Sequence, residues 1–96
     1  MYEGKYVLVR GDRSGVFAGT LKAKDGREVE LTECRRIWYW TGAASISQLA
    51  IDGTKKPQEC KFPAPVASIV ITDVIEIIPC TAEAEASIKA VEEWKM

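Results

Sequence analysis

The longest apolar run of the chain, VASIVITDVIEIIP at Val66–Pro79, constrains the fold more than any other stretch. The run is rich in valine and isoleucine, which favour strands over helices. It is long enough for one central strand, or for two shorter strands with a bend near Thr72 and Asp73. We therefore predict that the chain is built around a β-sheet.

Other segments supply strands that can pair with this run. Each combines β-branched or aromatic residues and is bounded by turn-forming residues. These segments are Lys5–Arg10, Val16–Ala23, Arg27–Glu33 and Arg35–Thr41. A curled antiparallel sheet of about five strands around one core suits a chain of this length and removes exposed sheet edges.

The second and third of these segments form a predicted hairpin, whose register depends on the length of its loop. A two-residue loop would place Leu21 opposite Glu30, an apolar residue against a charged one. A three-residue loop, Lys24–Gly26, places Leu21 opposite Val29 and gives Gly26 the left-handed position that such loops favour. We prefer the three-residue loop.

Two helices complete the predicted fold. Ser45 is a good N-cap for a short helix that ends at Gly53, and Thr81 is a good N-cap for a final helix over 82–94. The apolar residues of the short helix share one face: Ile46, Leu49 and Ala50. The predicted fold class is α+β, mainly antiparallel β. It is a small curled or barrel-like sheet with a short middle helix and a C-terminal helix, in a single domain over residues 1–96.

The charge balance argues against binding to duplex nucleic acid. The chain has 13 basic and 14 acidic side chains, and six of the acids but only two of the bases follow Thr72. The first 72 residues therefore carry a mild basic excess, far short of the dense positive patch that duplex DNA requires. No apolar run approaches the length of a membrane-spanning helix, and the N-terminus lacks a signal-peptide pattern. We expect a protein that stays in the cell that makes it and binds no membrane.

The chain also lacks the residues of common catalytic and metal sites. It contains no histidine, and its cysteines, Cys34, Cys60 and Cys80, form no closely spaced pair. Zinc sites use paired cysteines or histidines, and nucleophilic catalysis commonly needs a histidine base. We expect free thiols, no metal site, no cofactor and no enzymatic activity.

The stretch CRRIWYWTGAAS, which begins at Cys34, carries the candidate site. Alternate side chains along a strand share a face, which separates the stretch into two sets, Arg36/Trp38/Trp40 and Arg35/Ile37/Tyr39. Ile37 and Tyr39 are suited to the core. The side chains of the other set point to the opposite face of the predicted strand and must be covered by something else. Three interpretations stay open: the tryptophans fill the core, they cover a subunit interface, or they stack on a planar ligand whose phosphate an arginine holds.

The small residues that end this stretch lead into the short helix. A helix start offers unpaired N–H groups to an anion, although a plain capped helix is the alternative interpretation. The candidate ligand-binding residues are Arg35, Arg36, Trp38, Trp40, Ser45 and Ser47. Glu76 interrupts the apolar run, and we expect it to pair with an arginine of this stretch.

Three segments carry a resemblance to a known family: GVFAGTL at Gly15–Leu21, RRIWYWTGAASISQLAIDGTKKPQECKF at Arg35–Phe62, and VIEIIPCT at Val74–Thr81. With them, nearly the whole chain resembles a family of small, uncharacterised proteins encoded by tailed bacteriophages and prophages. The family has no established activity, so the resemblance implies no catalytic residues. It does imply a phage origin, and small phage proteins without enzymatic groups are often host-takeover or anti-defence factors.

These observations predict a non-enzymatic accessory protein that acts in the host bacterial cytoplasm. The leading hypothesis is an oligomeric binder, or sponge, for a small anionic ligand, namely a nucleotide-derived immune signal. In it, Trp38 and Trp40 stack on the ligand, Arg35 or Arg36 contacts phosphate, and the two serines add polar contacts. The alternative is a protein–protein interaction module, either a virion component or an inhibitor of a host protein, that docks through the tryptophan-rich face.

Overall fold

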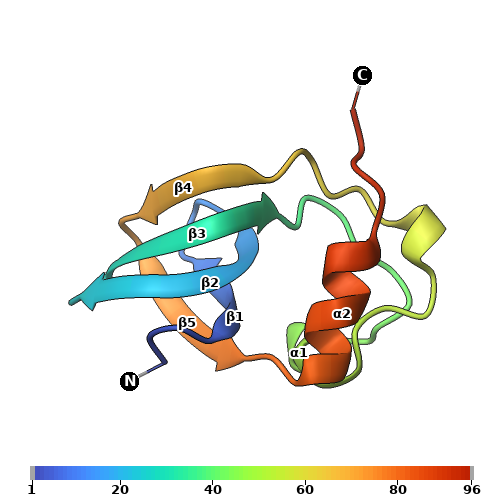
Figure 1. Cartoon of the computed structure of the whole chain (residues 1–96), viewed down its shortest axis with the longest axis horizontal. Helices are drawn as coiled ribbons and strands as arrows, with labels where there is room; N and C mark the ends of the chain where they lie inside the picture. The colour runs from blue at the N-terminus through green and yellow to red at the C-terminus, as the bar shows by residue number, and fades with distance from the viewer. Residues whose placement is uncertain (1, 96) are drawn as a thin grey trace.

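The computed structural model describes residues 2–95, which form five β-strands, two α-helices and one short 3₁₀ helix (Figure 1). The strands are β1 (Tyr6–Gly11), β2 (Val16–Asp25), β3 (Glu28–Arg36), β4 (Val66–Ile71) and β5 (Val74–Pro79). The helices are α1 (Ile46–Asp52), the 3₁₀ helix η1 (Pro57–Glu59) and α2 (Ala82–Ala90).

The strands form one antiparallel sheet in the order β4-β3-β2-β1-β5. β4 and β5 therefore lie at the two edges, although only Thr72 and Asp73 separate them along the chain. A link this short spans about 10 Å at most, so the two edges come close together and the sheet must curl. This confirms the predicted curled antiparallel sheet. It also shows that the Val66–Pro79 run is two strands rather than one. The expectation that curling removes the exposed edges is wrong, because β4 and β5 are not paired with each other within residues 2–95 and the sheet stays open.

The curled sheet encloses an apolar core to which every strand contributes. β1 shows how the sequence alternates: Val7 and Val9 point into this core, whereas Tyr6 and Leu8 point to the opposite face. We call the enclosed set the inner core; its buried members are Val7, Val9, Phe17, Leu21, Val29, Leu31, Cys34, Ile71 and Val74.

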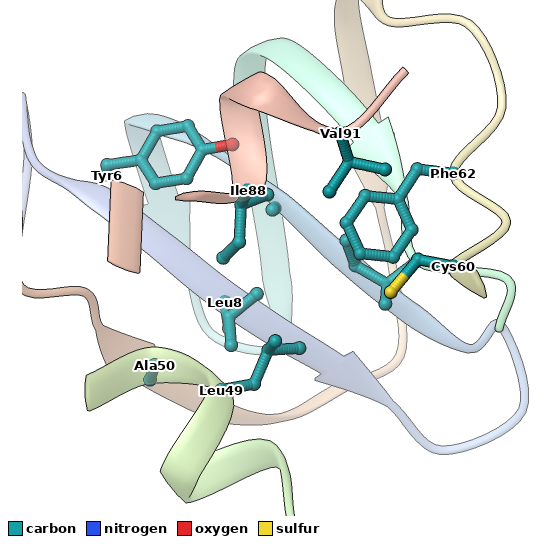
Figure 2. Close-up of a cluster of buried hydrophobic side chains, with 10 residues drawn as sticks. Tyr6, Leu8, Leu49, Ala50, Cys60, Phe62, Ile88 and Val91 are labelled. Carbon is teal, nitrogen blue, oxygen red and sulfur yellow. The ribbon is translucent and has the colours of Figure 1, made fainter. Parts of the chain in front are cut away.

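The opposite face of the sheet is covered by α1, α2 and the connection 37–65 (Figure 1). Figure 2 shows Leu8 of β1 between Leu49 of α1 and Ile88 of α2, with Phe62 of the connection beside them. We call this second set the outer core; its buried members are Tyr6, Leu8, Ala18, Ile37, Leu49, Ala50, Cys60, Phe62, Ile88 and Val91. β1 is thus buried on both faces of the sheet, whereas most of the edge strand β4 is exposed.

The hairpin between β2 and β3 differs from the predicted one. Asp25 pairs with Glu28, so the loop has two residues rather than three, and Leu21 pairs with Leu31 instead of Val29. The register shifts twice along the two strands. A register predicted from sequence assumes unbroken pairing, so an extra residue in one strand is enough to make it wrong.

The predicted strand over Arg35–Thr41 is also wrong. β3 continues through Arg36 and then leaves the sheet, and the next residues form only an isolated bridge at Tyr39. β4, one of the two neighbours of β3, begins opposite Cys34. β4 therefore offers no pairing partner to the residues that follow Arg36. The alternation argument therefore fails soon after Ile37, which is buried as predicted, and Tyr39 is exposed instead of lying in the core.

Both helices begin at the predicted caps. The Ser45 hydroxyl accepts a hydrogen bond from the Gln48 N–H, and the Thr81 hydroxyl accepts one from the Ala84 N–H. α1 ends at Gly53, whose φ of 73° favours glycine. These serine, threonine and glycine signals were sufficient to place three of the four helix ends.

The fourth end was placed too late. α2 stops at Ala90, whereas the prediction continued it to Trp94. The Arg35 guanidinium donates hydrogen bonds to the carbonyls of Ile88 (3.1 Å) and Val91 (2.6 Å), and so satisfies acceptors at the end of the helix. The chain then becomes extended and runs past the connection 37–65.

The helices within residues 2–95 include none that is long and apolar enough to cross a membrane. In the same part of the chain, no three cysteine or acidic side chains gather as a metal site. Cys34, Cys60 and Cys80 are free thiols, as predicted.

Candidate functional site

The most unusual surface feature is a stack of two tryptophans. The rings of Trp38 and Trp94 are parallel within 4°, with their centroids 5.1 Å apart, and Trp38 remains 58% exposed. The Lys61 ammonium lies 5.5 Å from the Trp38 ring, 5.7 Å from the Trp94 ring and 5.9 Å from the Tyr39 ring. We call Trp38, Tyr39, Lys61 and Trp94 the Trp38 cluster.

Backbone pairing holds three distant segments together at this cluster. Tyr39 and Lys61 exchange two hydrogen bonds, of 3.2 and 2.8 Å. Phe62 forms a parallel bridge with Glu93, and the Trp94 N–H donates to the Phe62 carbonyl at 2.9 Å. The buried Phe62 ring anchors the middle segment in the outer core (Figure 2). The cluster is therefore set by the fold rather than by one flexible loop.

The chemistry of the cluster suits a planar group with negative charge. An exposed indole face can stack on such a group, and the ammonium of Lys61 can meet its charge. A groove of about 430 Å³ opens beside Trp94. Its lining combines apolar and acidic residues: Pro57, Gln58, Cys60, Ala90, Glu92, Glu93 and Trp94.

Arg35, one of the predicted ligand contacts, points into the protein. The residue is only 6% exposed, and its guanidinium lies over the Phe62 ring at 5.4 Å. Besides the two carbonyls at the end of α2, it donates to the Phe62 carbonyl at 3.0 Å. Its terminal nitrogens thus join β3, α2 and the connection 37–65, away from the exposed face of Trp38.

Arg36 lies elsewhere on the surface. Its guanidinium stacks over the Phe17 ring at 4.5 Å and donates to the Ser14 carbonyl at 3.0 Å. Neither arginine pairs with Glu76, contrary to our expectation. The partner of Glu76 is Arg10, at 3.0 Å, because β1 and β5 are neighbours in the sheet and place these two residues opposite each other.

The three remaining predicted residues do not lie in the Trp38 cluster. Trp40 packs against the outer core and is only partly exposed. Ser45 uses its hydroxyl to cap α1, and Ser47 is exposed on the first turn of that helix. Of the six predicted residues, Trp38 is therefore the one that the structure brings into the cluster.

Sequence reasoning missed Lys61 and Trp94 as members of the candidate site. The six predicted site residues did not include Lys61, and Trp94 was placed at the end of the predicted helix over 82–94. The available signal was the count of tryptophans: two of the three lie in the opening stretch, so the third was a candidate partner for them. Its pairing with Trp38 depends on where α2 ends, and Arg35 donates hydrogen bonds to the carbonyls at that end.

Two of the thiols, those of Cys34 and Cys80, are not activated. Burial raises the pKa of Cys34 to about 11 and that of Cys80 to about 11. Both side chains are therefore protonated at neutral pH, whereas nucleophilic and metal-binding cysteines need the thiolate form.

The fold has a relative among solved structures. It is similar to the crystal structure of a heptameric archaeal Sm protein, with a TM-score of 0.53 and 22% sequence identity over 83% of this chain and 91% of that one. At this identity the match shows the fold, a small Sm-like β domain, and leaves the function open. The search of curated proteins returned no match.

The sequence also matches a family model over residues 4–88, which span all five strands and most of α2. This confirms the prediction of an uncharacterised family, while the phage origin stays a prediction. The chain belongs to the family described as "Domain of unknown function (DUF6948)".

Proposed function

We propose that this protein is a non-enzymatic, oligomeric binder of a nucleotide-derived immune signal. In this proposal it is a phage-encoded accessory protein that acts against host defence in the bacterial cytoplasm. The observation that carries the proposal is the Trp38 cluster: an exposed tryptophan stack with a lysine ammonium against its rings.

The cluster supplies the two contacts that a nucleotide needs. A base stacks on an aromatic face with little dependence on its identity, and each such contact contributes about 1–3 kcal/mol. Lys61 provides positive charge for phosphate beside that face. The Tyr39 ring, 49% exposed, extends the aromatic surface. The nearly balanced net charge of the chain, −1, favours a small ligand over a long nucleic acid.

The sheet edges support assembly of several copies. Among the described residues, β4 pairs only with β3 and β5 only with β1, so each edge has unpaired backbone groups. Exposed apolar residues lie on both edge strands: Val66, Val70 and Ile75. Pairing β4 of one copy with β5 of the next would repeat a head-to-tail contact, and such a contact gives a ring when the rotation between copies closes. The similar Sm protein is a heptamer, which is compatible with such an assembly.

A titration tests the proposal directly. Purified protein is titrated with cyclic dinucleotides, cyclic trinucleotides and ADP-ribose derivatives, with calorimetry and tryptophan fluorescence as readouts. We expect one class to release heat and change the fluorescence. Trp38→Ala should weaken its binding by about fivefold to 150-fold, since one stacked base is worth about 1–3 kcal/mol. Size-exclusion light scattering on the same sample should show a defined multimer.

Two lysines of the same connection give a matched control. Lys61→Ala removes the charge at the cluster and should weaken binding, whereas Lys55→Ala removes an exposed charge with no contact to the rings and should not. If none of the ligands produces a heat change, the proposed ligand class is wrong.

A second function is supported by the exposure of Trp38 and Tyr39. Large exposed aromatic residues are enriched at protein interfaces. If the protein is an interaction module, either a virion component or an inhibitor, it should co-purify with virions or with one host protein. Trp38→Ala would then abolish that association, and no nucleotide would bind.

A further inference from the structure

A second groove, of about 430 Å³, lies where β1 and β3 meet the end of α2. Its lining residues are Tyr6, Glu33, Arg35, Pro65, Lys89, Val91 and Glu93. Trp38 and Lys61 are not among them, so this groove is distinct from the Trp38 cluster and does not depend on the function proposed above.

The groove holds a buried positive charge that forms no ion pair within residues 2–95. Burial lowers the pKa of Arg35, although the charge of the Glu93 carboxylate on the rim favours the charged form and acts to raise it. Arg35 is 6% exposed, and its hydrogen bonds within the described chain all go to neutral carbonyls, those of Phe62, Ile88 and Val91. The end of α2 offsets part of the charge through its dipole. A full negative charge would offset the rest, because a buried ion is costly unless it is paired.

The guanidinium also has donors left over. It carries five N–H groups, of which two on Nη1 and one on Nη2 are used. The Nε–H, which is buried, has no hydrogen-bond partner in the described chain. Nε and Nη2 are the two nitrogens that a planar guanidinium can present side by side to a carboxylate, with two parallel hydrogen bonds.

Tyr6 brings a second unused polar group to the same groove. The residue is 5% exposed, and its buried hydroxyl likewise has no hydrogen-bond partner within residues 2–95. Burial raises the pKa of Tyr6, so the hydroxyl is a neutral donor at any physiological pH. In Figure 2 its ring lies at the end of the outer core, beside Ile88. Buried polar groups are seldom left without a partner, and here two of them line one groove.

We propose that this groove is a binding site for the carboxylate group of a small molecule. The carboxylate accepts hydrogen bonds from Arg35 Nε, from Arg35 Nη2 and from the Tyr6 hydroxyl. Both orphan donors are shielded from solvent in the present conformation. The Lys89 ammonium lies 5.0 Å from the Tyr6 ring and its side chain is half-exposed, so a displacement of this side chain would open the groove toward the Tyr6 hydroxyl.

The rim of the groove selects a singly charged group. Glu33 and Glu93 are exposed acidic residues of the lining, and Lys89 is paired with Glu85 at 2.6 Å. This acidic rim disfavours a doubly charged phosphate, whereas one negative charge is matched by Arg35. A ligand with an ammonium group near its carboxylate would, in addition, suit the two rim acids.

The test uses acetate and formate as probes, against chloride at constant ionic strength, with phosphate as the comparison anion. Thermal unfolding and the ¹⁵N–¹H resonance of Arg35 Nε are followed together. We expect acetate and formate to raise the Tm and to shift the Arg35 resonance in a saturable way, with a smaller effect of phosphate. Tyr6→Phe should weaken the acetate effect about tenfold, as expected for one lost hydrogen bond to a charged group. Its Tm without acetate should match or exceed that of the wild type, because a buried hydroxyl without a partner is removed.

Two controls keep the result specific. Tyr39→Phe removes a tyrosine hydroxyl at the Trp38 cluster, and Trp38→Ala removes its stack; both should retain the full acetate response. The proposal is overturned if acetate leaves the Arg35 Nε resonance unchanged, if Tyr6→Phe responds like the wild type, or if phosphate acts more strongly than acetate.

Discussion

The inner and outer cores lie on opposite faces of one sheet, but they are built differently. The inner core consists of strand residues alone, and every member is an apolar side chain or a free thiol. The outer core joins strands, helices and an irregular connection, and it includes the Tyr6 hydroxyl next to the buried Arg35. The inner core therefore needs only the strands of the sheet, whereas the outer core also needs the two helices and the connection 37–65.

This difference separates the part of the molecule that determines the fold from the part that carries the candidate binding residues. All three tryptophans lie on the outer side, Trp40 against the outer core and the other two in the Trp38 cluster. The Tyr6–Arg35 groove lies there as well. Binding residues often lie on irregular segments that a rigid sheet supports, and the outer layer of this protein follows that rule.

The largest expected effect comes from removing one side chain from each core. Phe62→Ala, in the outer core, should lower the free energy of unfolding by about 3–5 kcal/mol, and Leu31→Ala, in the inner core, by about 2–5 kcal/mol, because each leaves a buried cavity. Urea unfolding is followed by tryptophan fluorescence, which reports the outer layer, and by far-UV circular dichroism, which includes the sheet. In both variants we expect the two transitions to coincide.

The coincidence of the two signals is the informative part of that experiment. If Phe62→Ala moved the fluorescence transition alone, the outer layer would unfold while the sheet persists. The two cores would then be separate cooperative units, and the close dependence of the Trp38 cluster on the sheet would be contradicted.

The two layers also differ in how far the sequence predicts them. The strands of the inner core follow from β-branched runs, and the helix caps at Ser45 and Thr81 follow from local chemistry. The predicted hairpin register is wrong because the irregular pairing between β2 and β3 cannot be recognised from the alternation of apolar and polar residues in the sequence. The membership of the Trp38 cluster could not be predicted for a different reason: Trp38 meets Trp94 where the chain after α2 is extended, and the carbonyls at the end of α2 are bonded by Arg35, more than fifty residues earlier in the sequence.

The next effect concerns the caps that attach the helices to the outer core. Thr81→Ala should destabilise the protein by about 2 kcal/mol and Ser45→Ala by about 1 kcal/mol, both within the range for lost N-caps. The Thr81 hydroxyl caps α2 and also donates to the Ile51 carbonyl of α1 at 2.5 Å, so it links the two helices. The Ser45 hydroxyl caps α1 alone. Chemical denaturation measures both values, and equal losses would show that the link between the helices adds nothing.

The smallest effect is expected on the sheet side, where Asp73 joins the turn between β4 and β5 to the turn between β1 and β2. Its carboxylate accepts hydrogen bonds from the Ser14 hydroxyl (2.6 Å), the Arg13 N–H (2.8 Å) and the Ser14 N–H (3.0 Å). The bond from the Ser14 hydroxyl, followed by that from the Arg13 N–H, lowers the pKa of Asp73 below its ordinary value of 3.8. Since the folded state holds the proton less tightly than the unfolded state, the carboxylate stabilises the protein above pH 3.8 and loses this effect as the pH falls through the lowered pKa.

Asp73→Asn isolates this contribution, because asparagine retains one acceptor oxygen and removes the charge. Denaturation curves between pH 2.5 and pH 7 should show the variant to be less stable than the wild type near neutrality, with a difference that shrinks as the pH falls below 3.8. Asp12→Asn is the matched control: Asp12 is exposed in the adjoining turn, and its side chain forms no hydrogen bond or ion pair within residues 2–95. A pH-independent loss in Asp73→Asn would mean that the shape of the turn, rather than the carboxylate charge, joins these two turns. The polar contacts of the sheet side would then be as insensitive to pH as the N-caps of the helical side.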